Sequence, residues 1–135
     1  MTARASRLQL TAWTAGAGAG ATVGYGAILL AARARAYCDA GWEAGGKLEL
    51  NVLLVPVMAA FAGAALLGAM GARRATAQGS RGARATAQLL AVALVLTALT
   101  WWIFAWLGTL DGYPGDSGLC PASNVPPWWP HWIPA

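Results

Sequence analysis

The charged residues of this chain are few and unevenly placed, and their positions constrain the fold more than any other feature. Nine Lys/Arg and five Asp/Glu make up 10% of the 135 residues, against about 25% in an average soluble domain. Between them lie three uncharged stretches, residues 8–32, 50–72 and 85–110, which are 25, 23 and 26 residues long. About 20 helical residues cross a hydrocarbon core of about 30 Å. The sequence therefore predicts an all-α integral membrane protein with three transmembrane helices.

The segments outside these stretches complete a simple membrane topology. They are an N-terminus, two loops and a tail, at residues 1–7, 33–49, 73–84 and 111–135. Because two predicted helices separate the first loop from the tail, both lie on the same side of the membrane. We expect them to form a small cap there, with an irregular tail rich in tryptophan and proline.

The first uncharged stretch is diluted by five glycines between residues 16 and 26. Glycine lowers helix propensity, but small residues let membrane helices pack closely, so we predict a transmembrane helix. A cleaved signal peptide is the alternative, since arginines precede the stretch and Ala34-Arg35-Ala36 resembles a small-residue cleavage site. The apolar region of a signal peptide has about 7 to 15 residues, whereas this stretch has 25, which favours a retained helix.

The basic residues indicate how the helices are oriented, because positive charges near membrane spans prefer the cytoplasmic side. A cytoplasmic N-terminus places six arginines inside, at positions 4, 7, 73, 74, 81 and 84, and three basic residues outside, at positions 33, 35 and 47. All five acids then lie outside. We predict that the N-terminus is cytoplasmic and the C-terminus extracytoplasmic. The abundance of Ala, Arg and Gly resembles that of bacteria with GC-rich genomes, so the expected location is a bacterial plasma membrane.

The only two cysteines, Cys38 and Cys120, fall on the same predicted face of the membrane. In the favoured orientation this face is the oxidising one, so we predict a disulfide, with two free buried thiols as the alternative. With one histidine in the chain, His131, the ligands are too few for an ordinary zinc site. We expect no metal and no cofactor.

Small residues recur every four positions in the first two predicted helices. The rows are Gly16, Gly20 and Gly24 in the first helix, and Ala60, Ala64 and Gly68 in the second. Residues four apart share one helix face, and small faces allow the close contact that holds membrane helices together. The simpler interpretation is that the two helices pack on each other; the other is that a row docks on a partner or a second copy.

The predicted spans contain no Asp, Glu, Lys, Arg or His. Proton relays and ion-coupled transporters generally place ionisable groups at mid-membrane, so such a carrier is disfavoured. The polar side chains in the spans are mainly Thr14, Thr22, Tyr25, Thr97 and Thr100. Threonine hydroxyls can donate to carbonyls of their own helix, so these residues need no transport path to explain them.

The predicted inner loop is strongly basic. It carries Arg73, Arg74, Arg81 and Arg84 and no acid. We expect these arginines to contact anionic lipids of the cytoplasmic leaflet, at about 1 kcal/mol per residue. Nucleic-acid binding is not expected, because the loop has no aromatic residue for base stacking and topology already accounts for its charge.

Seven of the eight tryptophans fall in the outer half of the predicted topology. They are Trp42, Trp101, Trp102, Trp106, Trp128, Trp129 and Trp132. Tryptophan suits the headgroup level of a membrane because it combines an apolar ring with one donor. Four prolines among residues 126–135 exclude a regular helix and predict an extended, polyproline-like segment. We expect this tail to lie on the membrane surface or to dock on a partner, the last three tryptophans together with Trp101, Trp102 and Trp106 being the candidate contacts.

Only one segment has a catalytic appearance. Gly115-Asp116-Ser117-Gly118 resembles the sequence around the nucleophile of chymotrypsin-like proteases, but the resemblance covers four residues. The single histidine follows the serine, and the chain is too short for two β-barrels. A turn explains the segment, and calcium, which takes six to eight oxygen ligands, would find only two carboxylates here.

These observations favour a non-catalytic function. We expect an accessory or assembly subunit that docks on a larger membrane complex through its small-residue helix faces and its Trp/Pro tail. The expected partners are the lipid bilayer and either other membrane subunits or further copies of the chain. The alternative is an oligomeric small-molecule transporter or pore with the threonine-bearing faces lining the path.

Overall fold

The computed structural model describes residues 2–135, and the environments of side chains from Trp13 onward. It contains three α-helices: α1 (Thr2–Cys38), α2 (Ala44–Ala75) and α3 (Arg81–Ile103). A single π-helical turn, η1 (Phe104–Gly108), continues α3. Residues 2–135 form no β-strand. Each helix includes a segment long and apolar enough to cross a membrane, which confirms the prediction of an all-helical chain with three such helices.

The helices extend beyond the uncharged stretches. Residues 33–38 and 44–49, which we expected in a loop, belong to α1 and α2, so only residues 39–43 connect these helices. At the opposite end the connection between α2 and α3 is residues 76–80. Arginine, lysine and glutamate are good helix formers, so the first charge after an apolar stretch does not end a helix.

Local capping explains where α1 ends and where α3 begins. Asp39 takes a left-handed conformation with φ of 51°, and the Ala40 N–H donates to the Arg35 carbonyl at 3.1 Å. This is the hydrogen bond of a Schellman end, and it terminates α1. The Ser80 hydroxyl accepts from the Ala83 N–H at 3.2 Å and thereby caps the start of α3.

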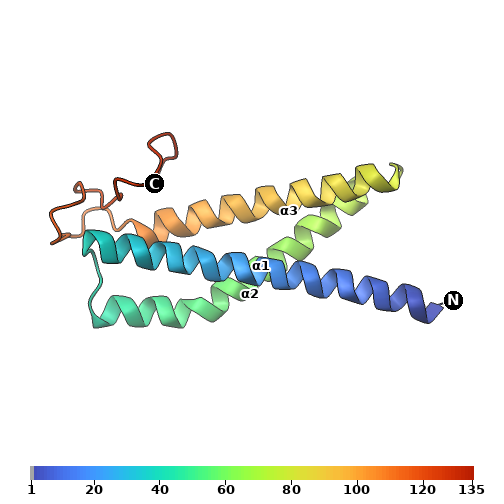
Figure 1. Ribbon diagram of the computed structural model, residues 1–135, viewed down its shortest axis with the longest axis horizontal. Coiled ribbons are helices and arrows are strands. Elements are labelled where there is room, and N and C mark those ends of the chain that lie inside the picture. Colours follow the sequence, from blue (N-terminus) through green and yellow to red (C-terminus); the bar gives the residue numbers. More distant parts are fainter. Residues whose placement is uncertain (1) are drawn as a thin grey trace.

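The long helices α1 and α2 cross near the middle of the molecule (Figure 1). At the crossing, a Cβ added to Gly20 would lie 2.6 Å from the Phe61 carbonyl oxygen and 2.8 Å from the Ala62 Cα. Only glycine fits this approach of backbone to backbone. Pro56 lies inside α2 and lacks the N–H that continues the ladder, which explains the change of direction of α2 visible in Figure 1.

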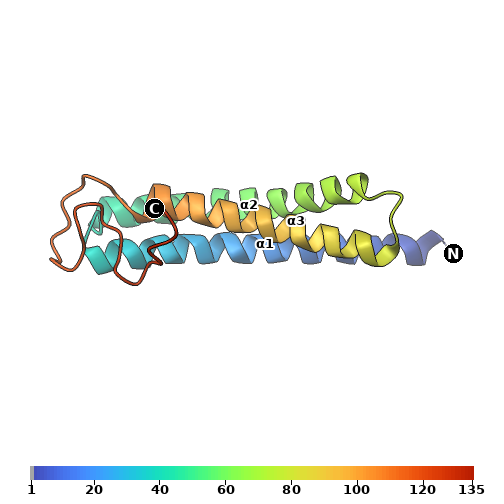
Figure 2. The same ribbon diagram turned by 90° about the horizontal axis from the view of Figure 1, so that it is seen from above.

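On either side of the crossing the helices pack differently, so the bundle has two distinct halves. We name the half that holds Cys38 the disulfide end and the half that holds the 76–80 connection the arginine end. At the arginine end the first turns of α1 diverge from α2 and α3 (Figure 1), and α1 extends beyond both of them (Figure 2). At the disulfide end η1 lies against α1, where Gly108 approaches the Ala31 backbone.

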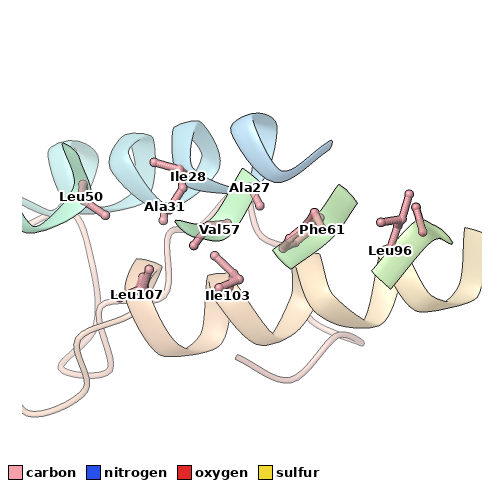
Figure 3. Packing of buried hydrophobic residues seen from close by; sticks show 10 residues of the cluster. Ala27, Ile28, Ala31, Leu50, Val57, Phe61, Leu96, Ile103 and Leu107 are labelled. Atoms are coloured by element: carbon pink, nitrogen blue, oxygen red, sulfur yellow. The ribbon is translucent and has the colours of Figure 1, made fainter. Parts of the chain in front are cut away.

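The apolar core lies mainly in the disulfide half, and Figure 3 shows its side chains directed into the space between the helices. Small and medium-sized residues of α1 face larger ones of α2, α3 and η1. The buried members are Ala27, Ile28, Ala31, Leu50, Val57, Phe61, Ala65, Leu96, Ile103 and Leu107. In each span fewer than a third of the residues are buried inside the molecule. Most of the helical surface therefore remains uncovered by the chain itself.

The two small-residue rows do not face each other. Gly20 and Gly24 contact α2, but through Met58, Phe61 and Ala62. The other row lies on a different side of α2, where Ala60 is exposed and Ala64 is half-buried. A Cβ added to Gly68 would lie 3.7 Å from atoms of Ala91 and Val95 in α3. Neighbouring residues of a helix point about 100° apart. Because Ala60 directly precedes Phe61, the row that begins at Ala60 lies on a different face of α2 from Phe61, which meets α1.

The crossing predicts opposite outcomes for two nearby glycines. Gly20→Ala forces the α1 and α2 backbones apart and should destabilise the protein by about 1–3 kcal/mol, the usual cost of overpacking. Gly18→Ala, on a face with nothing within 4 Å, should be neutral or stabilising because alanine is the better helix former. Denaturation with sodium dodecyl sulfate, followed by circular dichroism, measures both. Equal stability of the two variants would contradict the crossing geometry.

Candidate functional site

The disulfide end is closed by a covalent link between α1 and the C-terminal segment. Cys38 and Cys120 form a disulfide with their Cα atoms 5.4 Å apart, a usual separation for such a bond. The predicted disulfide is confirmed. It ties residues 109–135, which lack regular secondary structure, to the last residue of α1.

A buried arginine joins all three helices at this end. Arg35 of α1 is 1% exposed, although we expected it in a solvated loop. Its Nε–H donates to the Leu107 carbonyl in η1, and its Nη1 lies 2.9 Å from a carboxylate oxygen of Glu49 in α2. The side chain of Glu49 is 49% exposed. One guanidinium therefore connects α1 to α2 and to the continuation of α3.

The position of Arg35 has a simple electrostatic basis. The last carbonyls of a helix have no intrahelical donor and carry partial negative charge. Arg35 supplies the missing donor at the end of the α3–η1 segment, while Glu49 neutralises its charge. A buried charge without such partners would be strongly destabilising. The Nη2 group is buried without a hydrogen-bond partner, so the site is not fully satisfied.

Asn124 organises the connection that follows η1. It is 2% exposed, and its amide Nδ2 donates to the carbonyls of Leu110 and Tyr113, both at 2.7 Å. Gly115 passes so close that an added Cβ would lie 2.6 Å from the Asn124 Oδ1 and 2.8 Å from the Cys38 carbonyl oxygen. These contacts fold the 110–124 segment against the disulfide.

A second polar contact links the two connections at this end. The Tyr113 hydroxyl donates to a Glu43 carboxylate oxygen at 2.6 Å. This hydrogen bond, followed by the negative charge of Glu43 itself, raises the pKa of Tyr113 above its ordinary value, because the phenolate would lose the bond and face a like charge.

The proline-rich tail forms turns and not the extended segment that we expected. Its N–H to carbonyl hydrogen bonds span three residues and begin at Pro121, Pro126 and Pro130. The tail folds back toward α3 (Figure 1). A proline fixes one backbone angle in a turn as readily as in an extended chain, so composition alone does not distinguish them.

Tryptophans of the tail pack on this chain. Trp129 stacks on Phe104, with ring centroids 3.8 Å apart, and Trp128 meets the same ring edge-on at 6.3 Å. The Trp101 indole N–H donates to the Pro134 carbonyl at 2.6 Å. Trp132 is 83% exposed, against 44% for Trp128, and is the tail tryptophan most accessible to an outside contact. Phe104, 0% exposed, is the anchor of the tail.

An apolar groove of about 200 Å³ separates α2 from α3 in the disulfide half. Pro56 and Ala60 form part of its α2 wall, and the opposite wall includes Leu99 and Trp102 of α3 and Trp106 of η1. The two tryptophan rings are stacked with centroids 5.4 Å apart, and both remain about half exposed. The groove thus combines a small residue with two aromatic rings at the outer surface of the helices.

A larger cleft of about 460 Å³ lies at the arginine end, between the diverging part of α1 and the α2–α3 pair. Trp13 and Gly16 line it from α1, and apolar residues line it from α2. Arg73 and Arg84 also line it, whereas Arg74 and Arg81 do not. The four arginines of the predicted lipid contact are therefore not equivalent.

The remaining candidate residues form no reactive group. Among residues with described side chains, no three His, Cys, Asp or Glu lie together as a metal site would require. Ser117 accepts a hydrogen bond from the Leu119 N–H at 3.2 Å within a turn, and His131 is exposed.

Sequence reasoning missed Arg35, Glu49, Asn124 and Phe104. Arg35 and Glu49 were each treated as the first charge beyond a span. A weak signal was present, since opposite charges flanking a short connection between two apolar helices are placed to pair. Asn124 and Phe104 gave no local signal because their partners are distant in the chain.

No protein-family model matches this chain, and no curated protein or solved structure shows significant similarity to it.

We name the contacts of Arg35 with Leu107 and Glu49 the arginine joint. It predicts that the same substitution at two nearby arginines changes the free energy of unfolding by different amounts. Arg35→Lys keeps the charge but cannot donate in the fork geometry that reaches both Leu107 and Glu49. We expect a loss of about 1–3 kcal/mol of unfolding free energy. Arg33→Lys, at an exposed position, should have no effect. Denaturation monitored by tryptophan fluorescence compares them, and an Arg35→Lys variant as stable as the control would refute the joint.

The Tyr113–Glu43 bond predicts a pH dependence. Because the pKa of Tyr113 is raised in the folded protein, the bond contributes at ordinary pH and is lost as pH rises through that pKa. Glu43→Gln should lower the pKa toward the usual range, and Asp116→Asn should lower it less. Tyrosinate absorbance, with Tyr113→Phe to identify the signal, measures the titration. An unchanged pKa in Glu43→Gln would contradict the contact.

Proposed function

We propose that the protein is a non-catalytic, multi-pass subunit of a bacterial plasma membrane complex, with an accessory or assembly role. Its N-terminus is cytoplasmic and its C-terminus extracytoplasmic. The disulfide end, with its cap and Trp/Pro tail, then lies outside, where disulfides persist. All five acids lie at this end and the four arginines at residues 73–84 lie at the other, in keeping with the preference of positive charge for the cytoplasmic side.

The observation that carries the docking proposal is the apolar groove between α2 and α3. We assign it to a transmembrane helix of a different membrane protein. Ala60 gives the close approach that membrane helices need, and the Trp102–Trp106 pair provides large apolar area of the kind that dominates interfaces. The groove has no charged residue, so the partner surface should be apolar as well.

The structure changes which elements are available for docking. Gly20 and Gly24 approach α2, and Gly16 lines the cleft at the arginine end, so this row faces into the molecule and offers no outer face to a partner helix. Most of the tail is held by Phe104 and the disulfide, and Trp132 is its most exposed tryptophan. We therefore place the main docking surface on α2 and α3, and a secondary one at Trp132.

The alternative function is an oligomeric transporter or pore with threonines along the path. The Thr22 and Thr100 hydroxyls donate to the carbonyls four residues earlier in their own helices, at 2.9 and 2.8 Å. Hydroxyls used in this way offer less to a passing solute. The accessory role is the better supported of the two.

Filling the groove tests the accessory role. Ala60→Leu places a larger apolar side chain in the groove, and Ala59→Leu makes the same change on an exposed neighbouring face. We expect one integral membrane protein to copurify with wild type and Ala59→Leu, and its recovery to fall about tenfold or more with Ala60→Leu. A photo-crosslinking amino acid in place of Ala60 should label the same protein.

Two results would contradict the proposal. One is an unchanged set of copurifying proteins in the Ala60→Leu variant. The other is ion conductance or solute uptake by liposomes that contain this protein alone, which would favour the pore.

A further inference from the structure

The cleft at the arginine end is amphipathic, with a polar mouth and an apolar interior. Arg73 and Arg84 line it next to the 76–80 connection, at the end that we name its mouth, and residues such as Ala65, Leu66 and Val92 line the part further from that connection. The volume of about 460 Å³ is in the range of ligand-binding pockets. The cleft exists because α1 diverges from α2 and α3 beyond the Gly20 crossing.

The two guanidinium groups at the mouth are available to an anion. Arg84 donates through Nε to the Gly79 carbonyl at 3.0 Å, which holds the side chain in place and leaves its terminal amino groups without a partner among the residues whose side chains are described. Arg73 has no ion-pair or hydrogen-bond partner in the described part of the chain. Every acidic residue of the protein lies at the opposite end.

The side-chain amide of Gln88 also lines the cleft, next to the two arginines. Gln88 donates to the Ala69 carbonyl at 3.3 Å and thereby joins α3 to α2 beside the arginines. The donors come from both helices, and the apolar wall continues below them toward the core. A ligand that fits needs an anionic group at one end and a long apolar chain at the other.

We infer that this cleft is a binding site for one anionic phospholipid, with its phosphate between Arg73 and Arg84 and an acyl chain along the cleft against Gly16. Guanidinium groups bind phosphate oxygens through paired hydrogen bonds, and basic pockets between membrane helices select anionic headgroups. A zwitterionic lipid brings its own cation against the two arginines and binds less well. This inference rests on the membrane insertion proposed above, but not on the docking partner.

Native mass spectrometry of the purified full-length protein tests the site. The protein is titrated in mild detergent with dioleoylphosphatidylglycerol or dioleoylphosphatidylcholine. We expect one phosphatidylglycerol to bind at least about tenfold more tightly than phosphatidylcholine. The double variant Arg73→Gln/Arg84→Gln should weaken phosphatidylglycerol binding about 30-fold.

The loop provides a matched control. Arg74→Gln/Arg81→Gln removes the same charge from the same loop but not from the cleft, and it should retain tight binding. A second pair tests the apolar part: Gly16→Leu should block the acyl chain, and Gly18→Leu, on an open face, should not. Circular dichroism and the intact disulfide verify folding of each variant.

The outcomes are decisive in either direction. Equal losses in the two double arginine variants would mean that only surface charge attracts lipid, and would overturn the site. Equal binding of the two lipids by wild type would do the same, as would tight binding by Gly16→Leu. Because the purified protein is tested without a partner, these results are independent of the Ala60→Leu experiment.

Discussion

The fold depends on one buried guanidinium. Arg35 of α1 donates to a carbonyl at the end of the α3–η1 segment and pairs with Glu49 near the start of α2. Without Glu49 the charge of Arg35 would be uncompensated, and without the Leu107 carbonyl its Nε–H would be buried with no acceptor. Together they fix where the three helices end relative to one another. The disulfide at Cys38, one turn further along α1, ties the C-terminal segment to the same end of the bundle.

This joint and the glycine crossing divide the packing between the two halves of the bundle. At the crossing, Gly20 brings α1 and α2 into backbone contact, so beyond it the helices must separate on at least one side. Arg35 holds them on the disulfide side. The core, the buried arginine and Asn124 therefore share one half, and the cleft with its arginines occupies the other.

The sequence predicts the helices and the disulfide because both follow from contributions of single residues or from their order along the chain. Charge spacing predicts three apolar helices because the cost of burying charge in lipid applies to each residue separately. Helix count places Cys38 and Cys120 on one face, and the disulfide follows. The same rule failed for Arg35, because it treats every charge as solvated. Burial of Arg35 depends on the Leu107 carbonyl, 72 residues away, which no local pattern reveals.

The tail and the small-residue rows show a related limit. Trp129 packs on Phe104 because η1 and the disulfide bring the two together, and proline content is equally compatible with turns and with an extended chain. Likewise a four-residue repeat identifies a helix face but not its neighbour: Gly68 approaches α3, while Gly20 meets α2.

The division of the molecule also separates its two proposed surfaces. The α2–α3 groove lies in the half that Arg35 and the disulfide hold firmly, so a partner helix meets a surface whose shape is already set, which lowers the entropic cost of association. The arginine cleft lies where α1 has fewer contacts. There a lipid chain supplies the packing that the protein lacks, and its phosphate neutralises two neighbouring arginines that have no acidic partner. The groove therefore depends on a rigid half of the bundle, and the cleft depends on a bound lipid for its packing. Both follow from the position of the crossing between α1 and α2.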